Sequence, residues 1–260
     1  MLFRSSNLFD LSGKTAIITG SSRGIGKAIA EQMAAHGAKV VISSRKLAAC
    51  EAVADTINKQ HGEGTAIAVA ANISSKDELQ NLVDQTSAAF GDIHILVCNA
   101  ASNPYYGPMA DIDDDRFQKI LTNNVVANNW LISMVSPQMI ARQDGAVIIV
   151  SSIGGLKGSP IIGAYCISKA ADFQLARNLC VEYGRHNVRV NCIAPGLIKT
   201  DFARALWENP DNLKAALSRT PMQRIGEPNE IAGAAVFLAS AAGAYMNGQQ
   251  ITIDGGATIT

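Results

Sequence analysis

The stretch Thr15-Ala16-Ile17-Ile18-Thr19-Gly20-Ser21-Ser22-Arg23-Gly24-Ile25-Gly26 decides the fold of this chain. A short β-branched run leads into a glycine-rich turn, and a helical pattern follows over about residues 24–36. Glycines let a backbone approach a pyrophosphate, and the free N–H groups at a helix N-terminus attract its charge. The spacing is Gly-x-x-x-Gly-x-Gly, so a turn that merely needs glycine is the alternative. Its place at the first strand-to-helix junction favours a dinucleotide site.

The rest of the chain repeats this alternation without a linker or an internal repeat. Buried strands are expected at residues 15–19, 39–43, 65–70, 93–97, 146–150, 188–192 and 250–253, with helices near 24–36, 47–61, 75–89, 113–141, 163–184 and 228–240. Apolar strands that each precede a helix indicate a parallel sheet covered on both faces, with ligands at the carboxyl edge. We expect one α/β domain over residues 1–260, a Rossmann-type doubly wound parallel sheet of seven strands.

Composition excludes several classes of function. The chain has 22 basic and 22 acidic residues, so no basic excess indicates nucleic acid or a membrane surface. Residues 1–11 lack an apolar segment, which argues against a secretory signal. The five cysteines are widely spaced and the four histidines are isolated, so we expect reduced thiols, no metal site and a cytoplasmic protein.

A second informative stretch runs from residue 151 to residue 169. Ser152 follows the strand expected at 146–150, and Tyr165 and Lys169 lie one turn apart on a helix. A phenol with a pKa of about 10 needs a lowered pKa to exchange protons near neutral pH, and a neighbouring ammonium favours phenolate. This combination suits proton transfer at an alcohol or carbonyl oxygen, although Tyr-x-x-x-Lys alone also arises by chance.

Polar residues also follow the other strands. Ser44 and Arg45 stand where an NAD-selective site carries an acidic residue, so Arg45, with Arg23, is expected to pair with a 2′-phosphate. An exposed arginine at the start of a helix is the alternative. Asn72 is placed to meet an adenine edge, and Asn99 either faces the cofactor or only forms a turn. The sequence therefore predicts NADP, with NADPH preferred over NADH.

Two loops are candidates for substrate recognition. Tyr105, Tyr106 and Met109 either line a substrate pocket or pack within their own loop. After Pro195 and Gly196 an irregular stretch continues to about residue 221, which we interpret as a lid over residues 199–221.

Together, in this order and spacing, these motifs resemble the classical short-chain dehydrogenase/reductase (SDR) family over essentially the whole chain. The matching motifs are Thr19-Gly20-x-x-x-Gly24-x-Gly26, Asn99-Ala100-Ala101, Ser152, Tyr165-x-x-x-Lys169 and Pro195-Gly196-x-x-x-Thr200. The resemblance implies a catalytic tetrad of Asn124, Ser152, Tyr165 and Lys169. In it Tyr165 transfers the proton, Ser152 polarises the substrate oxygen, Lys169 lowers the tyrosine pKa and binds the nicotinamide ribose, and Asn124 holds a relay water.

The cofactor-binding residues that motif and resemblance together imply lie at successive strand ends. They are Gly20, Ser22, Arg23, Gly24, Ile25, Gly26, Ser44, Arg45, Asn72, Ile73, Asn99, Ala100, Ala101, Tyr165, Lys169, Pro195, Gly196, Ile198 and Thr200. The chain departs from the family where Asn72 replaces a common Asp, and where Cys98 and Ala101 flank Asn99-Ala100.

Within the family the chain looks most similar to NADPH-dependent carbonyl and retinol reductases. The expected activity is an NADP(H)-dependent oxidoreductase that interconverts a small-molecule ketone or aldehyde and its alcohol. A 3-oxoacyl-[acyl-carrier-protein] reductase and a non-catalytic dinucleotide-binding sensor are the alternatives. The resemblance also implies a homotetramer, built through the segments 113–141, 163–184 and 250–253.

Overall fold

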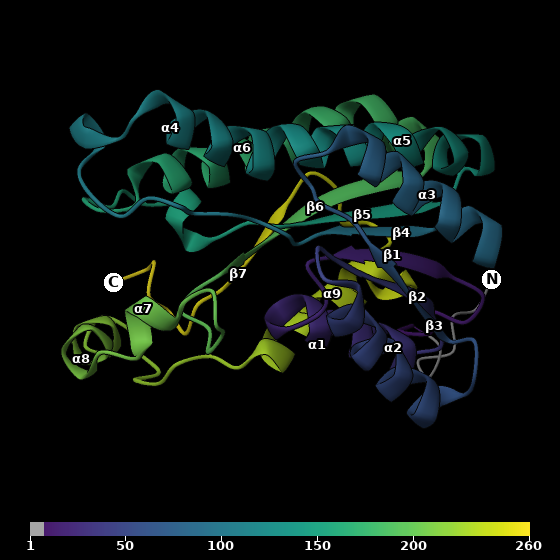
Figure 1. The fold of residues 1–260 in the computed structure, drawn as a ribbon, viewed down its shortest axis with the longest axis horizontal. Helices are drawn as coiled ribbons and strands as arrows, with labels where there is room; N and C mark the ends of the chain where they lie inside the picture. Colours follow the sequence, from purple (N-terminus) through teal and green to yellow (C-terminus); the bar gives the residue numbers. More distant parts are fainter. Residues whose placement is uncertain (1–7) are drawn as a thin grey trace.

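The computed structural model describes residues 8–260. The expectation that residues 1–11 carry no secretory signal therefore falls mostly outside the described residues. The seven strands form one sheet in the order β3-β2-β1-β4-β5-β6-β7, and all six neighbouring pairs are parallel (Figure 1). The strands are β1 (Thr15–Thr19), β2 (Lys39–Ser44), β3 (Ala66–Ala70), β4 (Ile95–Cys98), β5 (Gly145–Val150), β6 (Val188–Pro195) and β7 (Gln250–Ile253). The strand order reverses between β1 and β4, which is where a doubly wound sheet opens its ligand crevice. The expected doubly wound sheet of seven parallel strands is confirmed.

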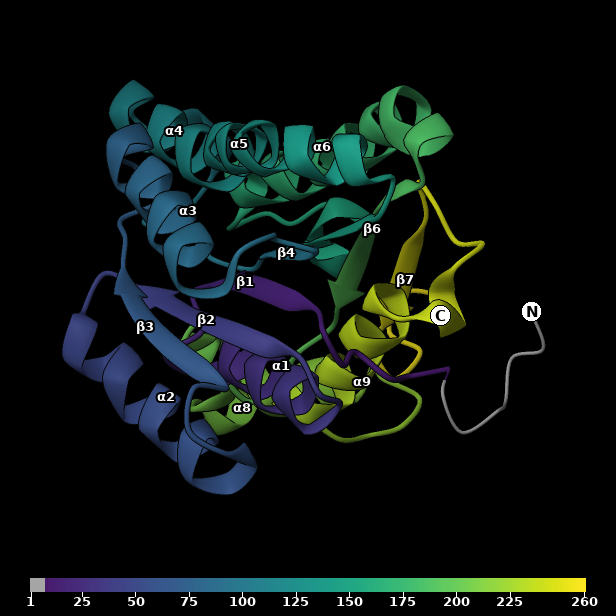
Figure 2. The ribbon, with the colours of Figure 1, turned by 90° about the vertical axis from the view of Figure 1, so that its right-hand side faces the viewer.

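Helices cover the two faces of the sheet in separate layers (Figures 1 and 2). One layer contains α1 (Gly24–Ala35), α2 (Leu47–His61) and α9 (Pro228–Ala239), and the other contains α3 (Lys76–Phe90), α4 (Asp114–Leu121), α5 (Ala127–Arg142) and α6 (Gly163–Tyr183). The short helices α7 (Arg204–Trp207) and α8 (Pro210–Leu217) lie together at one end of the molecule, near the C-terminus in Figure 1. Short 3₁₀ turns occur at Met109–Asp111, Ile153–Gly155, Gly184–His186 and Ala241–Gly243.

The sheet separates two hydrophobic cores. Ile18 and Ile42 point into the core beneath α1, α2 and α9, whereas Ile17 and Val41 belong to the core beneath α3, α5 and α6. Successive strand residues alternate between the two cores, so each central strand is apolar on both faces. This explains why the strands read as continuous apolar runs in the sequence.

Two sequence expectations differ in detail from the structure. The helix expected over 113–141 has a continuous helical backbone, but a π-helical turn at Thr122–Val126 divides it into α4 and α5. The stretch after Gly196 is not irregular throughout, since it contains α7 and α8. Asn209 caps α8 by accepting hydrogen bonds from two main-chain N–H groups, and Pro210 occupies its first turn, which are ordinary helix-start signals.

Between residues 8 and 260, no helix is both long enough and apolar enough to cross a membrane.

Candidate active site

The glycine-rich turn is packed so tightly that side chains would not fit. Gly20 and Gly24 adopt positive φ angles of 68° and 57°. A Cβ atom on Gly26 would lie 2.5 Å from the Gly20 carbonyl oxygen and 2.5 Å from the Asn99 amide nitrogen. The turn therefore brings bare backbone to the carboxyl end of β1, as close approach of a pyrophosphate requires.

Asn99 is the residue that holds this turn. Its amide donates to the carbonyl oxygens of Thr19 at 2.8 Å and Gly20 at 3.2 Å. The Thr19 hydroxyl in turn accepts from the main-chain N–H groups of Asn99 and Ala100. The Asn99 side chain thus fastens the end of β4 to the end of β1. The Asn99 amide therefore contributes to the site by fixing the main chain of the glycine-rich turn.

The N-terminus of α1 is suited to an anion. Within residues 8–260 its N-cap, Arg23, makes no side-chain capping bond, and the first turn of the helix contains no acidic residue. Free N–H groups and the positive end of the helix dipole therefore face the turn. These features fit a dinucleotide pyrophosphate held against Gly20–Gly26.

The residues predicted to select the cofactor lie on the neighbouring strand ends. Arg45 is exposed directly after β2, and Ser44 faces the Cys50 thiol with its hydroxyl oxygen 3.1 Å from the sulfur. Arg23 forms an exposed ion pair at 3.2 Å with Asp201, which lies in the segment expected to form a lid. The side-chain oxygen of Asn72 accepts a hydrogen bond from the Ser74 N–H. This bond closes a local turn after β3.

Ser152, Tyr165 and Lys169 gather at the carboxyl end of β5. The Ser152 hydroxyl accepts from the Gly154 N–H at 3.0 Å, and its presence near Tyr165 acts to lower the pKa of that phenol. The Lys169 ammonium lies 5.8 Å from the centre of the Tyr165 ring and donates to the Val150 carbonyl oxygen at 2.9 Å. The structure thus brings these three predicted site residues together.

The second donor bond of Lys169 goes to a residue that sequence reasoning missed. Its ammonium contacts the Asp172 carboxylate at 3.0 Å, and both side chains are almost completely buried. The other Asp172 oxygen accepts from the Asn128 amide at 3.2 Å. Asp172 stands three residues after Lys169 on the same helix face, so the spacing itself was the available signal.

Asn124 lies in the π-helical turn, and its side chain bonds groups other than Lys169. Its amide donates to the Ser102 carbonyl and the Ser168 hydroxyl, each at 3.0 Å, and its oxygen accepts from the Ser102 N–H. Its main-chain carbonyl accepts from the Asn128 amide at 2.6 Å. The side chain therefore ties the loop after β4 to α6, and the main-chain carbonyl connects to the Asp172 cluster.

The pKa of Tyr165 differs from the sequence expectation. Burial raises the pKa of this phenol, and the opposing influence of the Lys169 charge and the Ser152 hydrogen bond does not reverse the shift. The pKa of Tyr165 therefore shifts in the direction opposite to the one expected from the neighbouring lysine. Burial acts to lower the pKa of Lys169, but the Asp172 carboxylate and the Tyr165 phenol together outweigh it, so the pKa lies above the ordinary value.

The segment expected to form a lid lies beside Tyr165 at one point. The Phe202 ring lies 6.0 Å from the Tyr165 ring, and the Trp207 indole donates to the Thr200 carbonyl at 2.9 Å. Ile198, which is buried, pairs with Gly226 across an isolated β-bridge. An apolar ring thus stands directly beside the tyrosine.

The loop of residues 102–109 follows β4 and contacts the segment before α6. The Gly107 N–H donates to the Ile161 carbonyl, and the Tyr105 hydroxyl donates to the Pro108 carbonyl within its own loop. Tyr106 and Met109 are partly exposed, at 49% and 41%. The buried Asn103 side-chain oxygen has no hydrogen-bond partner among the described residues.

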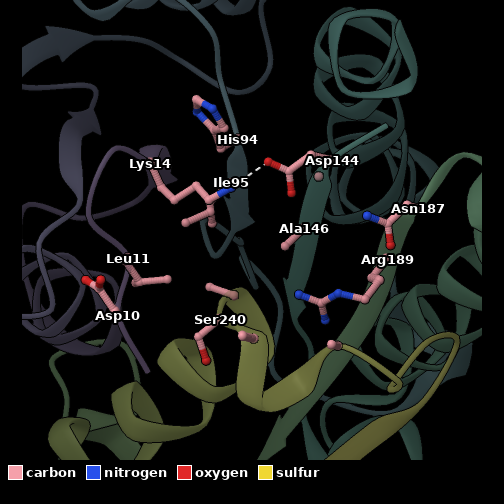
Figure 3. Close-up of a pocket in the computed structure, with 14 residues that line it drawn as sticks. Asp10, Leu11, Lys14, His94, Ile95, Asp144, Ala146, Asn187, Arg189 and Ser240 are labelled. Carbon is pink, nitrogen blue, oxygen red and sulfur yellow. Dashed lines mark hydrogen bonds and ion pairs between the residues drawn. The ribbon is translucent and has the colours of Figure 1, made fainter. Parts of the chain in front are cut away.

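A separate pocket opens at the opposite, amino-terminal edge of the sheet (Figure 3). It has a volume of about 210 Å³ and is bordered by Lys14, His94, Asp144 and Arg189. None of the predicted site residues lines it. The predicted site therefore lies at the carboxyl edge of the sheet, apart from this pocket.

The fold and the carboxyl-edge residues define an oxidoreductase of the dinucleotide-binding α/β class, and comparison with known proteins gives the family. A family model described as enoyl-(acyl carrier protein) reductase matches residues 20–258. The chain is 38% identical over 247 residues to dehydrogenase/reductase SDR family member 4 of Bos taurus, covering 95% of this chain and 88% of that protein. It therefore belongs to the SDR family.

Other relatives show how varied the family is. A tropinone reductase homolog of Arabidopsis thaliana is 35% identical, with 96% of this chain and 94% of that protein covered. A gluconate 5-dehydrogenase from Burkholderia cenocepacia, solved with NADP and tartrate, superposes with a TM-score of 0.93 at 31% identity over 99% of this chain and 100% of that chain. A 7α-hydroxysteroid dehydrogenase, solved with NADH and 7-oxo glycochenodeoxycholic acid, has a TM-score of 0.92 at 36% identity over 98% of each chain.

Proposed function

We propose that this chain is an NADP(H)-dependent oxidoreductase that interconverts a ketone or aldehyde and the corresponding alcohol. The observation that carries the proposal is the grouping of Ser152, Tyr165 and Lys169 beside a glycine turn that admits a pyrophosphate. When bound, the nicotinamide would supply or accept the hydride. The protein's own part is to position the substrate oxygen and to move its proton.

In this proposal Tyr165 gives its proton to the substrate oxygen, and the Ser152 hydroxyl donates a hydrogen bond to the same atom. Burial raises the pKa of Tyr165, so the phenol is protonated near neutral pH and has a proton to give. Lys169 supplies the positive charge that stabilises the phenolate left behind. The Phe202 ring, 6.0 Å from the Tyr165 ring, would give the substrate an apolar neighbour at this position.

The preference for NADP rests on Arg45. It is exposed at the end of β2, where no carboxylate stands to accept from a ribose hydroxyl. A guanidinium there can form charge-assisted hydrogen bonds with a 2′-phosphate. The solved relatives include complexes with NADP and with NADH, so they support a dinucleotide site without deciding between the two.

For the oligomeric state we propose a homotetramer. On α6, Val181 is 84% exposed and Ile167 is 46% exposed, so this helix presents apolar side chains outward. Light scattering of the purified protein would give the assembly mass directly. The five free thiols fit the proposed cytoplasmic location, where disulfides are rare.

The test of function is a substrate panel of aryl ketones, diketones and 3-oxoacyl thioesters, measured as oxidation of NADPH and separately of NADH. We expect turnover of carbonyl compounds with NADPH. Turnover confined to 3-oxoacyl thioesters would instead indicate an acyl-chain reductase. Tight binding of NADPH without turnover of any compound would contradict the proposal and favour a sensor.

A further inference from the structure

Asp172 is the one buried carboxylate among residues 8–260 that the proposed mechanism does not use. It lies within α6, one turn from Lys169, with 0% of its side chain exposed. A buried charge costs several kcal/mol of solvation, and an apolar pair of similar size is often as stable or more so. Stability alone therefore gives no reason for a carboxylate at this position.

The contacts of Asp172 form a continuous chain of direct hydrogen bonds. One oxygen accepts from the Lys169 ammonium at 3.0 Å, and the other accepts from the Asn128 amide at 3.2 Å. The same amide donates to the Asn124 carbonyl at 2.6 Å. The helices α5 and α6 lie side by side on one face of the sheet (Figure 2). The series of hydrogen bonds therefore connects the π-helical turn to Lys169.

The titratable groups that surround Lys169 and Asp172 are mostly neutral thiols, so these two side chains carry most of the charge in this part of the core. Cys98 at the end of β4 and Cys192 on β6 face Asp172, and burial raises the pKa of both thiols, so both stay neutral. Arg177 lies farther along α6 and influences Cys192. On its other side Lys169 faces Tyr165, beside which the Cys166 thiol also has a pKa raised by burial.

Lys169 without Asp172 would be a buried ammonium that only the Val150 carbonyl solvates among the described residues. Burial favours the neutral amine under such conditions. A neutral amine would no longer stabilise the Tyr165 phenolate, and Tyr165 feels the lysine charge more strongly than that of Asp172. Loss of the carboxylate would therefore make the tyrosine harder to ionise.

We propose that Asp172, anchored by Asn128, is a positioning residue that holds Lys169 at the end of β5 and keeps it positively charged beside Tyr165. The inference rests on the proposed function, because Lys169 matters only if Tyr165 exchanges a proton. Asp172 acts through Lys169 and does not itself touch the substrate.

The test is a pH titration of Tyr165 in the full chain, followed by the ultraviolet absorbance of tyrosinate. The signal of Tyr165 is the difference between each protein and the same protein that also carries Tyr165→Phe. We expect Asp172→Asn to move the ionisation of Tyr165 to higher pH by about one unit or more, and Asn128→Ala to move it the same way by less. The limb of the pH profile for alcohol oxidation should move with it. An ionisation of Tyr165 that is unmoved, or moved to lower pH, in folded Asp172→Asn would overturn the inference.

The control for general destabilisation is Asn191→Ser. Asn191 is as deeply buried, but it bonds the Met246 carbonyl and the Gln249 N–H. The Asn191→Ser variant should have a lower free energy of unfolding, while its Tyr165 should ionise at the same pH as in the parent chain. If Asp172→Asn fails to fold, Asn128→Ala decides alone, because it removes the amide that bonds Asp172 and the Asn124 carbonyl but leaves both charged side chains in place.

The titration also separates this inference from the proposed function. A shift in Tyr165 ionisation supports the role of Asp172 even where no substrate is turned over. Turnover with an unshifted titration in the folded variants would overturn that role and leave the oxidoreductase assignment standing.

Discussion

Two Lys–Asp pairs stand at opposite edges of the same sheet and differ mainly in burial. Lys169 and Asp172, at the carboxyl edge, have side-chain exposures of 2% and 0%. Lys14 and Asp144, at the amino edge, have exposures of 34% and 41% and border the pocket of Figure 3. Water screens the second pair and is excluded from the first, so the same chemistry has different consequences.

The difference in burial shows which of the two ion pairs can influence a neighbouring reactive group. A solvated pair adds little to stability and depends on salt, whereas a buried pair cannot lose one partner without stranding a charge. The buried pair lies beside Tyr165, whose ionisation depends on local charge. Substitutions at the two edges, and at the exposed Arg45, test this contrast, and the largest effect is expected in the core.

Removing one member of the buried pair should cause the greatest loss. Asp172→Ala removes the counter-charge of buried Lys169, which must then stay charged without a partner or lose its proton, and should lower the free energy of unfolding by about 3–5 kcal/mol. Urea denaturation followed by circular dichroism measures this change. A loss as small as that of an exposed pair would show that water reaches the site and that the contrast between the two edges is false.

Arg45 extends the comparison to an exposed cation that acts on a ligand. Arg45→Ala should weaken NADPH binding roughly tenfold to a hundredfold, the worth of a hydrogen bond to a charged group. NADH binding and protein stability should stay unchanged. Fluorescence titration with both cofactors measures the effect, and the neighbouring Lys46→Ala is the matched control. Equal weakening of both cofactors would contradict a 2′-phosphate contact.

Replacing both members of the buried pair should restore most of the lost stability. The double variant Lys169→Met with Asp172→Leu leaves no stranded charge, so its free energy of unfolding should lie within about 1 kcal/mol of the parent value. Catalytic turnover should nevertheless be lost. A stable double variant with near-parental turnover would remove Lys169 from the mechanism.

The exposed pair should give the smallest effect. Asp144→Asn should change the free energy of unfolding by less than about 1 kcal/mol, and that change should fade as salt is added. Urea denaturation at low and high ionic strength checks both points. A salt-independent loss comparable with that of Asp172→Ala would mean that the two edges are not different in kind.

The sequence predicted the sheet and the grouping of several site residues because its signals are local. The strands are apolar runs bounded by glycine and polar residues, and the parallel arrangement then places Gly20, Asn99 and Ser152 at one edge without further information. Tyr165 and Lys169 share a helix face by spacing alone. These parts of the prediction depended on no long-range contact.

The missed parts depend on contacts between distant segments. The π-helical turn forms where Asn123 bonds Ser74 and Ser102, and where Asn124 bonds Ser168, and no local propensity encodes such partners. The spacing shows that Asp172 shares a helix face with Lys169, but a lone Asp within a helix usually lies on the solvated face, so its burial becomes evident only when α6 is packed on the sheet. The raised pKa of Tyr165 was missed for the same reason, because spacing shows the nearby cation but not the burial.

The central claim is that Tyr165 passes a proton to the substrate oxygen, and the most direct measurement compares NADPH-dependent carbonyl reduction by the parent chain and by Tyr165→Phe. General acid catalysis typically contributes a factor of about 10²–10⁴, so the variant should lose at least about a hundredfold in kcat. Its NADPH affinity should remain close to that of the parent chain. A near-parental kcat in a variant that binds NADPH normally would contradict the account.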